Sequence, residues 1–243
     1  MIIYGINPVL EALRATRVRR LRVSARGDKR IDDVLALAAA QHVAVERVDA
    51  QALERVARGG VHQGVVAEVE DARDYSVQEI VERAAGAPLV VVLDGIEDPH
   101  NVGAILRTAD AAGVSGIVRQ TRHAAALDGV VGKASAGALS HVRIATVVNI
   151  ARAVEDLKDA NVWTVGLAGD AADAYTAVDW TLPSAIVLGA EGTGLRRLVR
   201  DRCDRLVKIP MLGAVDSLNV SVAAGVVLYE AVRQRRQGAD GEG

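Results

Sequence analysis

The sequence predicts an α/β fold built from two unequal domains. Half of the 243 residues are hydrophobic, which is enough to bury a full core. Valine-rich strand patterns alternate with helical patterns throughout, and the strand patterns become longer after an acidic, polar segment that closes on Gly86-Ala87-Pro88. We therefore expect a small α/β domain over residues 1–73, a linker over residues 74–87 and a larger α/β domain over residues 88–243.

The small domain alternates strands and helices over about 70 residues. Helices are expected over 9–13, 31–42 and 50–56, and strands over 21–24, 43–48 and 65–69. Basic residues crowd its front and form either a phosphate-contacting patch or a solvated turn. These residues are Arg14, Arg17, Arg19, Arg20, Arg22, Arg26, Lys29 and Arg30. The domain contains no catalytic constellation, so we expect it to hold a ligand.

The larger domain begins with a continuous apolar run, 89–93, which is typical of a strand covered on both faces. A helix is expected over 102–112, where Gly113 stops it. Further strands are expected over 116–118, 142–145, 162–167, 185–188 and 206–209. This pattern predicts a mostly parallel sheet with helices on both faces, whose ligand lies beyond the carboxyl ends of the strands.

The last helical stretch starts as a polar cluster around Asn219 and becomes almost continuously apolar up to Tyr229. Its spacing predicts that most of the helix circumference and its polar end are buried. Ser217 is alternatively a simple helix cap. The tail after Arg233 is expected to fray.

Composition excludes several classes of protein. The one cysteine, Cys203, excludes an internal disulfide and is typical of a reducing compartment. No Cys and His residues have metal-ligand spacing, so we expect no metal. No apolar run approaches the roughly 18 residues of a membrane span, and we expect a soluble cytoplasmic protein without a membrane partner.

Three strand ends carry polar or glycine-rich clusters. Asn101 and Arg107 follow the strand at 89–93, the glycine-rich segment 189–194 follows the strand at 185–188, and Asn219 follows the strand at 206–209. Neither a Walker A loop nor a Gly-x-Gly-x-x-Gly fingerprint is present. The glycines are either an ordinary turn or a backbone surface for a flat ligand such as adenine. Glu191 is expected to form an ion pair with Arg107.

These clusters resemble the motifs of the SpoU (TrmH-like) RNA ribose methyltransferases of the SPOUT superfamily. Segment 98–109 (DPHNVGAILRTA) is similar to the first motif. Segments 188–195 (LGAEGTGL) and 209–211 (IPM) resemble the second, and 217–223 (SLNVSVA) resembles the third. Segments 4–13 (YGINPVLEAL) and 62–65 (HQGV) are similar to the family's small substrate-binding domain, which resembles ribosomal protein L30e. With 133–138 (KASAGA), the similarity is greatest to the bacterial enzymes that methylate a guanosine 2′-hydroxyl in 23S ribosomal RNA.

The resemblance implies a C-terminal trefoil knot, S-adenosylmethionine as cofactor, RNA as substrate and a homodimer. The positions that match the family's cofactor contacts are Leu188, Gly189, Ile209, Met211 and Leu218. The positions that match its catalytic and RNA-facing residues are Asn101, Arg107, Glu191, Ser217 and Asn219.

The family assigns activation of the ribose hydroxyl to the arginine that matches Arg107. An arginine hardly ever loses its proton, so stabilisation of a developing alkoxide by Arg107 is physically easier, with a phosphate or Asn219 helping to take the proton. RNA affinity is expected from the basic front and from Arg196, Arg197, Arg200 and Arg202. Two alternatives stay open: a transfer RNA ribose methyltransferase, and a noncatalytic RNA-binding assembly factor with the same fold.

Overall fold

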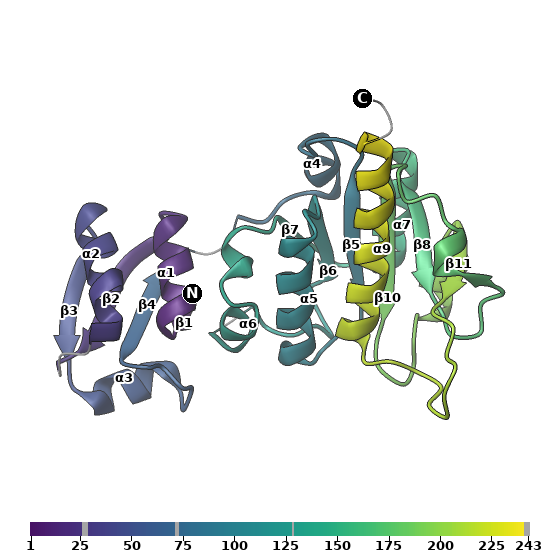
Figure 1. Ribbon diagram of the computed structural model, residues 1–243. Coiled ribbons are helices and arrows are strands. Elements are labelled where there is room, and N and C mark those ends of the chain that lie inside the picture. Colours follow the sequence, from purple (N-terminus) through teal and green to yellow (C-terminus); the bar gives the residue numbers. More distant parts are fainter. Residues whose placement is uncertain (26–28, 71–72, 128, 241–243) are drawn as a thin grey trace. The chain divides into compact units, whose positions relative to one another are not determined.

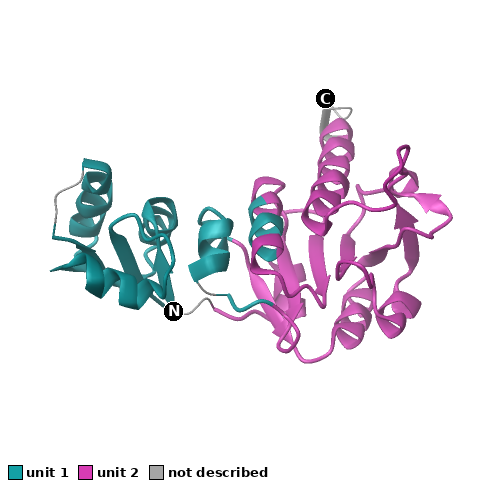
Figure 2. Ribbon diagram, turned by 90° about the horizontal axis from the view of Figure 1, so that it is seen from below, with its two compact units in different colours: residues 1–72, 102–107, 125–141 teal, residues 73–101, 108–124, 142–243 magenta. Residues whose placement is uncertain are grey.

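A computed structural model describes residues 1–25, 29–70, 73–127 and 129–240 of the chain. The chain divides into two compact units (Figure 2). The first comprises residues 1–72, 102–107 and 125–141, and the second comprises residues 73–101, 108–124 and 142–243. Arg26, one of the basic residues expected to contact phosphate, lies outside the described residues.

The first unit is built on a four-stranded mixed sheet of order β1-β4-β2-β3 (Figure 1). Its β4 runs antiparallel to both neighbours, whereas β2 and β3 are parallel. The strands are β1 Ile2–Tyr4, β2 Val18–Ser24, β3 Ala44–Val48 and β4 Val65–Val69. The helices are α1 Ile6–Arg14, α2 Asp32–Ala40, α3 Ala50–Ala57 and α6 Gly129–Ala134, with single helical turns at Lys29–Ile31 and Ala138–Ser140.

Alternation along β4 explains the layers of this unit. Val65 and Ala67 pack with residues of α1 and α2 in one apolar cluster, whereas Val66 packs with Tyr4 and Leu53 in another. Successive side chains of a strand point to opposite faces, so both faces of the sheet are covered.

The second unit is built on a seven-stranded sheet of order β7-β6-β5-β10-β8-β11-β9, and every pairing in it is parallel. The strands are β5 Leu89–Asp94, β6 Gly116–Gln120, β7 Ile144–Val147, β8 Trp163–Leu167, β9 Asp173–Ala174, β10 Ser184–Gly189 and β11 Arg205–Lys208. All six residues of β5 are buried, as expected for a strand covered on both faces. The mixed α/β fold with a parallel-sheet C-terminal part is therefore confirmed.

Helices cover both faces of this sheet (Figure 1). They are α4 Val77–Glu82, α5 Pro99–Ala111, α7 Ile150–Asp159, α8 Arg197–Arg202 and α9 Val220–Asp240, with a helical turn at Tyr175–Ala177. Ile80 of α4 and Leu157 of α7 are fully buried in the same apolar cluster as Val90 and Val187 of the central strands. Helix α9 packs against β10. Helix α4 lies inside the segment expected to be a linker.

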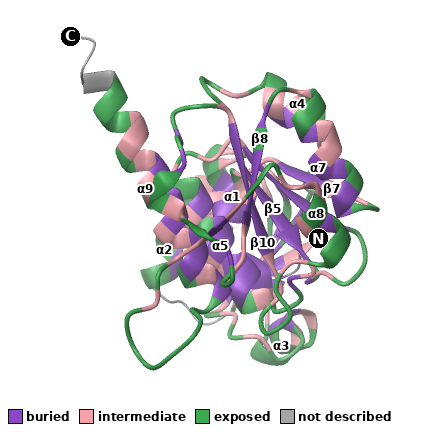
Figure 3. Ribbon diagram, turned by 90° about the vertical axis from the view of Figure 1, so that its right-hand side faces the viewer, coloured by how far each residue is buried: buried purple, intermediate pink, exposed green. Residues whose placement is uncertain are grey.

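Helix α9 differs from its expected burial. Figure 3 shows buried, intermediate and exposed positions along α9. The helix buries one face, including Ala224 and Leu228, but Val222 is 51% exposed and Tyr229 is 52% exposed. The expectation that most of the circumference is buried is therefore wrong, because apolar residues stand on the open side of the helix as well.

The tail after Arg233 is helical up to Asp240, so the expected fraying is wrong for residues 234–240, and residues 241–243 lie outside the described residues. Two side chains in this part of α9 have backbone partners in the segments that precede β5 and β10. Gln234 accepts a hydrogen bond from the backbone of Trp180 and donates one to the carbonyl of Val178. The guanidinium of Arg235 donates to four backbone carbonyls, those of Ala87, Pro88, Trp180 and Leu182.

Candidate active site

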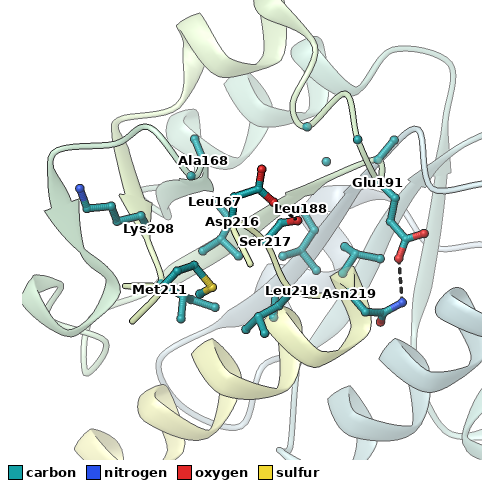
Figure 4. Close-up of a pocket in the computed structure, with 18 residues that line it drawn as sticks. Leu167, Ala168, Leu188, Glu191, Lys208, Met211, Asp216, Ser217, Leu218 and Asn219 are labelled. Carbon is teal, nitrogen blue, oxygen red and sulfur yellow. Dashed lines mark hydrogen bonds between the residues drawn. The ribbon is translucent and has the colours of Figure 1, made fainter. Parts of the chain in front are cut away.

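A hollow of about 720 Å³ lies beyond the carboxyl ends of β8, β10 and β11 (Figure 4). Its walls come from the loop after β8, the glycine-rich segment after β10 and the segment between β11 and α9. A ligand pocket usually has a volume of roughly 300 to 1,000 Å³. All five residues expected to contact the cofactor line this hollow: Leu188, Gly189, Ile209, Met211 and Leu218.

The glycine-rich segment folds back on the end of β10. The amide of Gly194 donates to the carbonyl of Ala190 at 2.8 Å, which closes a tight turn. A Cβ atom on Gly189 would lie 2.1 Å from the backbone carbon of Gly194, so no side chain fits there. Gly192 and Gly194 have positive φ angles of 77° and 66°, which glycine adopts without strain. This turn therefore needs its glycines for backbone geometry, as expected for a backbone wall.

Asn219 joins the three sequence clusters through its side chain. Its Nδ2 donates to Oδ1 of Asn101 at 2.9 Å and to Oε1 of Glu191 at 2.7 Å. Its Oδ1 accepts from the backbone amide of Ser221 at 2.9 Å and from the Ser221 hydroxyl at 2.6 Å. The segment after β10, helix α5 and the residue just before α9 thus each contribute one side chain to a cluster at the rim of the hollow.

The sequence of this site matches a known family. The SpoU rRNA Methylase family matches residues 88–229, and a family described as RNA 2′-O ribose methyltransferase substrate binding matches residues 2–75. The chain belongs to the SpoU rRNA methylase family. The SpoU match includes each of the three polar clusters.

Curated relatives of this SpoU protein share its full length. The chain is 44% identical over 240 residues to the 23S rRNA (guanosine-2′-O-)-methyltransferase RlmB of Pseudomonas putida, with 96% of each chain covered. It is 45% identical over 240 residues to the protein of the same name from Xanthomonas campestris pv. campestris, again with 96% of each chain covered.

Solved structures of SpoU proteins have the same fold. The SpoU methyltransferase AviRb from Streptomyces viridochromogenes, in complex with the cofactor AdoMet, superposes with a TM-score of 0.83 at 27% identity. That match covers 98% of this chain and 91% of AviRb. The A. aeolicus TrmH/SpoU tRNA modifying enzyme is 29% identical with a TM-score of 0.58, and the match covers 67% of this chain and 84% of that one.

Two expected residues of the SpoU site stand apart from the hydrogen-bonded cluster. Ser217 lines the hollow, but its hydroxyl donates to Asp216. Asn219, not Ser217, caps the start of α9, because its side chain accepts from the Ser221 amide. The polar start of the helix is exposed rather than buried, since it borders the hollow.

Arg107 is exposed on α5. Across the described ranges it makes no ion pair, and because Arg107 belongs to the first unit and Glu191 to the second, the expected pair stays a prediction. Glu191 accepts a hydrogen bond from the Asn219 amide.

An anchor that the sequence did not reveal holds the glycine-rich segment from its far end. Asp94, buried at the end of β5, accepts from the backbone amide of Arg196 at 2.8 Å and from its Nε at 2.6 Å. The same guanidinium donates to Oε1 of Gln120, at the end of β6. The only sequence signal was an acidic residue that follows a continuous apolar run.

Cysteine reactivity, metal binding and membrane insertion find little support in the described residues. Burial raises the pKa of the Cys203 thiol to about 12, so the thiol stays protonated near neutral pH. Within the part of the chain that the structure describes, no group of three His, Cys, Asp or Glu side chains could hold a metal ion. None of the described helices is long and apolar enough to cross a membrane.

Proposed function

We propose that this SpoU-family enzyme transfers a methyl group from S-adenosylmethionine to the ribose 2′-hydroxyl of a guanosine in 23S ribosomal RNA. The observation that carries the proposal is the Asn219 cluster, which joins residues of all three sequence motifs at the rim of a ligand-sized hollow. The full-length curated relatives are named for this reaction.

The residues of the hollow fit S-adenosylmethionine. Backbone from the glycine-rich turn and apolar side chains such as Leu188 and Met211 suit a flat adenine ring. Lys208 and Asp216 also line the hollow, and their opposite charges suit the carboxylate and ammonium groups of an amino acid. When bound, S-adenosylmethionine supplies a methyl group on a positively charged sulfur.

The side chains of the cluster act on the ribose hydroxyl. The expectation that Asn219 helps to take the hydroxyl proton is not supported, because its oxygen already accepts two hydrogen bonds from Ser221 and its nitrogen is a donor. Glu191 is the carboxylate that contacts Asn219, so it is a suitable acceptor for that proton. Arg107 is retained as a cation that stabilises the developing alkoxide.

We propose that the three parts of the chain predicted from the sequence have separate roles. Residues 1–73 bind RNA, residues 74–87 connect the parts, and residues 88–243 form the catalytic domain and its trefoil knot. The match of residues 2–75 to a substrate-binding family supports this division. A homodimer in the cytoplasm completes the proposal.

Methylation of a transfer RNA ribose is the main alternative. The solved tRNA-modifying enzyme matches only 67% of this chain, whereas the 23S enzymes match 96%. The difference favours ribosomal RNA, since the curated relatives that match 96% of this chain are named for 23S rRNA.

Methyl transfer from tritiated S-adenosylmethionine to unmodified 23S rRNA and to unmodified transfer RNA tests the proposal. Label is expected in 23S rRNA. Label only in transfer RNA would favour the alternative, and binding of RNA without any label would indicate a noncatalytic assembly factor.

A further inference from the structure

A second hollow, of about 580 Å³, adjoins the first. It lies beyond the carboxyl ends of β5 and β6, between the loop that enters α5 and the glycine-rich segment. Glu191 and Val220 line both hollows, Asn219 lines only the first, and Asn101 lines only the second. The hydrogen-bonded cluster therefore forms part of the wall between the two.

The hydrogen bonds determine which way the Asn101 amide points. The backbone amide of Ser221 can only donate, so Asn219 must turn its oxygen toward Ser221 and its nitrogen toward Asn101 and Glu191. Asn101 must then present its oxygen to Asn219, which leaves its own NH₂ group pointing elsewhere. Among the described residues this NH₂ group has no acceptor, and because no buried side-chain nitrogen or oxygen there lacks a partner, the group is accessible from the surface.

The charges of the second hollow do not suit a phosphate group. Its cationic guanidinium, on Arg196, is already neutralised by buried Asp94. The remaining ionisable side chains at its edge include Glu97 and Asp98, which would repel an anion, and His123, which lies 3.3 Å from the Glu97 carboxylate. Ile96 and Val220 supply buried apolar surface. A neutral ligand with an apolar face and hydrogen-bonding edges fits these features.

We propose that the second hollow holds the acceptor nucleoside, turned out of the RNA, and that the NH₂ group of Asn101 donates a hydrogen bond to its ribose 2′-oxygen. This inference rests on the proposed function, and it gives the RNA side of the reaction a site of its own. Enzymes that modify a nucleotide within a structured nucleic acid commonly extrude it into such a pocket. The shared wall places the cluster between the methyl donor and the acceptor oxygen.

A variant that fills the second hollow tests whether the acceptor nucleoside binds there. Thr193 lines the second hollow but not the first, and its side chain is exposed. Thr193→Trp is expected to lower methyl transfer to 23S rRNA by at least ~30-fold and to leave the Kd for S-adenosylmethionine within about threefold. The control Thr176→Trp changes an exposed threonine that lines neither hollow, so transfer should not change.

A cycle that combines one change in the RNA with one change in the protein tests the hydrogen bond from Asn101 to the ribose 2′-oxygen. Competition binding compares RNA that carries guanosine or 2′-deoxyguanosine at the target position, with the wild type and with Asn101→Ala. The deoxy substitution should weaken binding to the wild type about fivefold, the usual effect of one neutral hydrogen bond, and should have no effect on the variant. A residue that only supports Asn219 would give the same deoxy effect in both proteins.

Three results would overturn the inference. They are full methyl transfer by Thr193→Trp, loss of S-adenosylmethionine binding in that variant, and an equal deoxy effect in wild type and Asn101→Ala. Failure of the proposed function would look different, because the wild type itself would then transfer no methyl group to 23S rRNA.

Discussion

At the scale of single residues, the side chain of Asn219 makes four hydrogen bonds. It uses both polar atoms, and each faces two partners: Asn101 and Glu191 on the nitrogen, and two groups of Ser221 on the oxygen. No other side chain of the same shape offers two donors on one side and an acceptor on the other. This arrangement explains why an asparagine stands at this position.

Asn219→Asp is therefore expected to be severely defective, although it is nearly isosteric. The new carboxylate can still accept from Ser221, but it places a negative charge against Glu191 in place of a donor. We expect methyl transfer to fall ~100-fold in single-turnover assays, with unfolding by urea little changed. Activity within a few-fold of the wild type would show that the amide donor is dispensable.

Arg107 is the residue whose role depends most on the family resemblance. Because it is exposed and lines neither hollow, Arg107→Ala should leave S-adenosylmethionine binding unchanged in calorimetry. Methyl transfer should nonetheless fall by ~100-fold if the guanidinium stabilises the alkoxide. Comparable turnover in the variant would remove Arg107 from the mechanism, and the matched variant Arg83→Ala controls for the loss of an exposed arginine.

Sequence reasoning identified the residues of the site better than their partners. Asn101, Glu191 and Asn219 were expected from the ends of three strands, and they meet in the structure. The capping role of Ser217 was wrong, because serine and asparagine two residues apart are equally good caps and Asn219 takes that role. The Asp94–Arg196 anchor joins residues about 100 positions apart, which local pattern cannot show.

At the scale of elements, the C-terminal part of α9 is held by a small polar network. Glu230 accepts from Arg233 and Gln234. Gln234 in turn donates to the carbonyl of Val178 and accepts from the backbone amide of Trp180. The Trp180 side chain is fully buried. This network explains why the tail is helical although its local sequence predicts fraying.

The network makes a prediction about acid stability. The hydrogen bond from Arg233 lowers the pKa of Glu230 from 4.5 to about 2. A lowered pKa stabilises the folded state above pH 4.5, and the stabilisation is lost as the pH falls toward 2. The difference in unfolding free energy between wild type and Glu230→Gln should therefore be constant at neutral pH and shrink below pH 4.5, as measured by urea unfolding. A difference that does not depend on pH would contradict this assignment.

How well the sequence predicted each strand depended on the length of its hydrophobic pattern. The continuous valine-rich runs predicted the core strands to within a few residues, since short length and β-branched residues favour a buried strand over a buried helix. Two strands were missed: β1, which covers Ile2–Tyr4, and β9, which covers Asp173–Ala174. Strands of two or three residues are too short to show any periodicity, and only their neighbours in the sheet stabilise them.

At the scale of the whole molecule, RNA binding must arise on a chain with a net charge of −2. Much of the expected basic surface is already paired. Arg14, Arg19 and Arg22 face glutamates in the first unit, and Arg196, Arg200 and Arg202 face carboxylates in the second. Exposed ion pairs are worth only about 0 to 1 kcal/mol, so most of these arginines can exchange a carboxylate for a phosphate at small cost.

Affinity for RNA is therefore expected to fall as salt rises. Arg20 and Arg197 are exposed and make no ion pair among the described residues, so they are the arginines most ready to contact phosphate. Each change to alanine should reduce the slope of log K against log salt by roughly one if that arginine contacts a phosphate. Filter binding between low and moderate salt measures the slope, and a flat response in the wild type would refute an electrostatic account of RNA binding.

We propose that methyl transfer to a ribose oxygen of 23S rRNA takes place where the two hollows adjoin. The most direct measurement incubates unmodified 23S rRNA with the protein and isotopically labelled S-adenosylmethionine, digests the RNA to nucleosides, and identifies the labelled product by mass spectrometry. We expect 2′-O-methylguanosine from the wild type and ~100-fold slower formation of it by Asn219→Asp. Label on a base, or no labelled nucleoside from an enzyme that binds both S-adenosylmethionine and RNA, would contradict it.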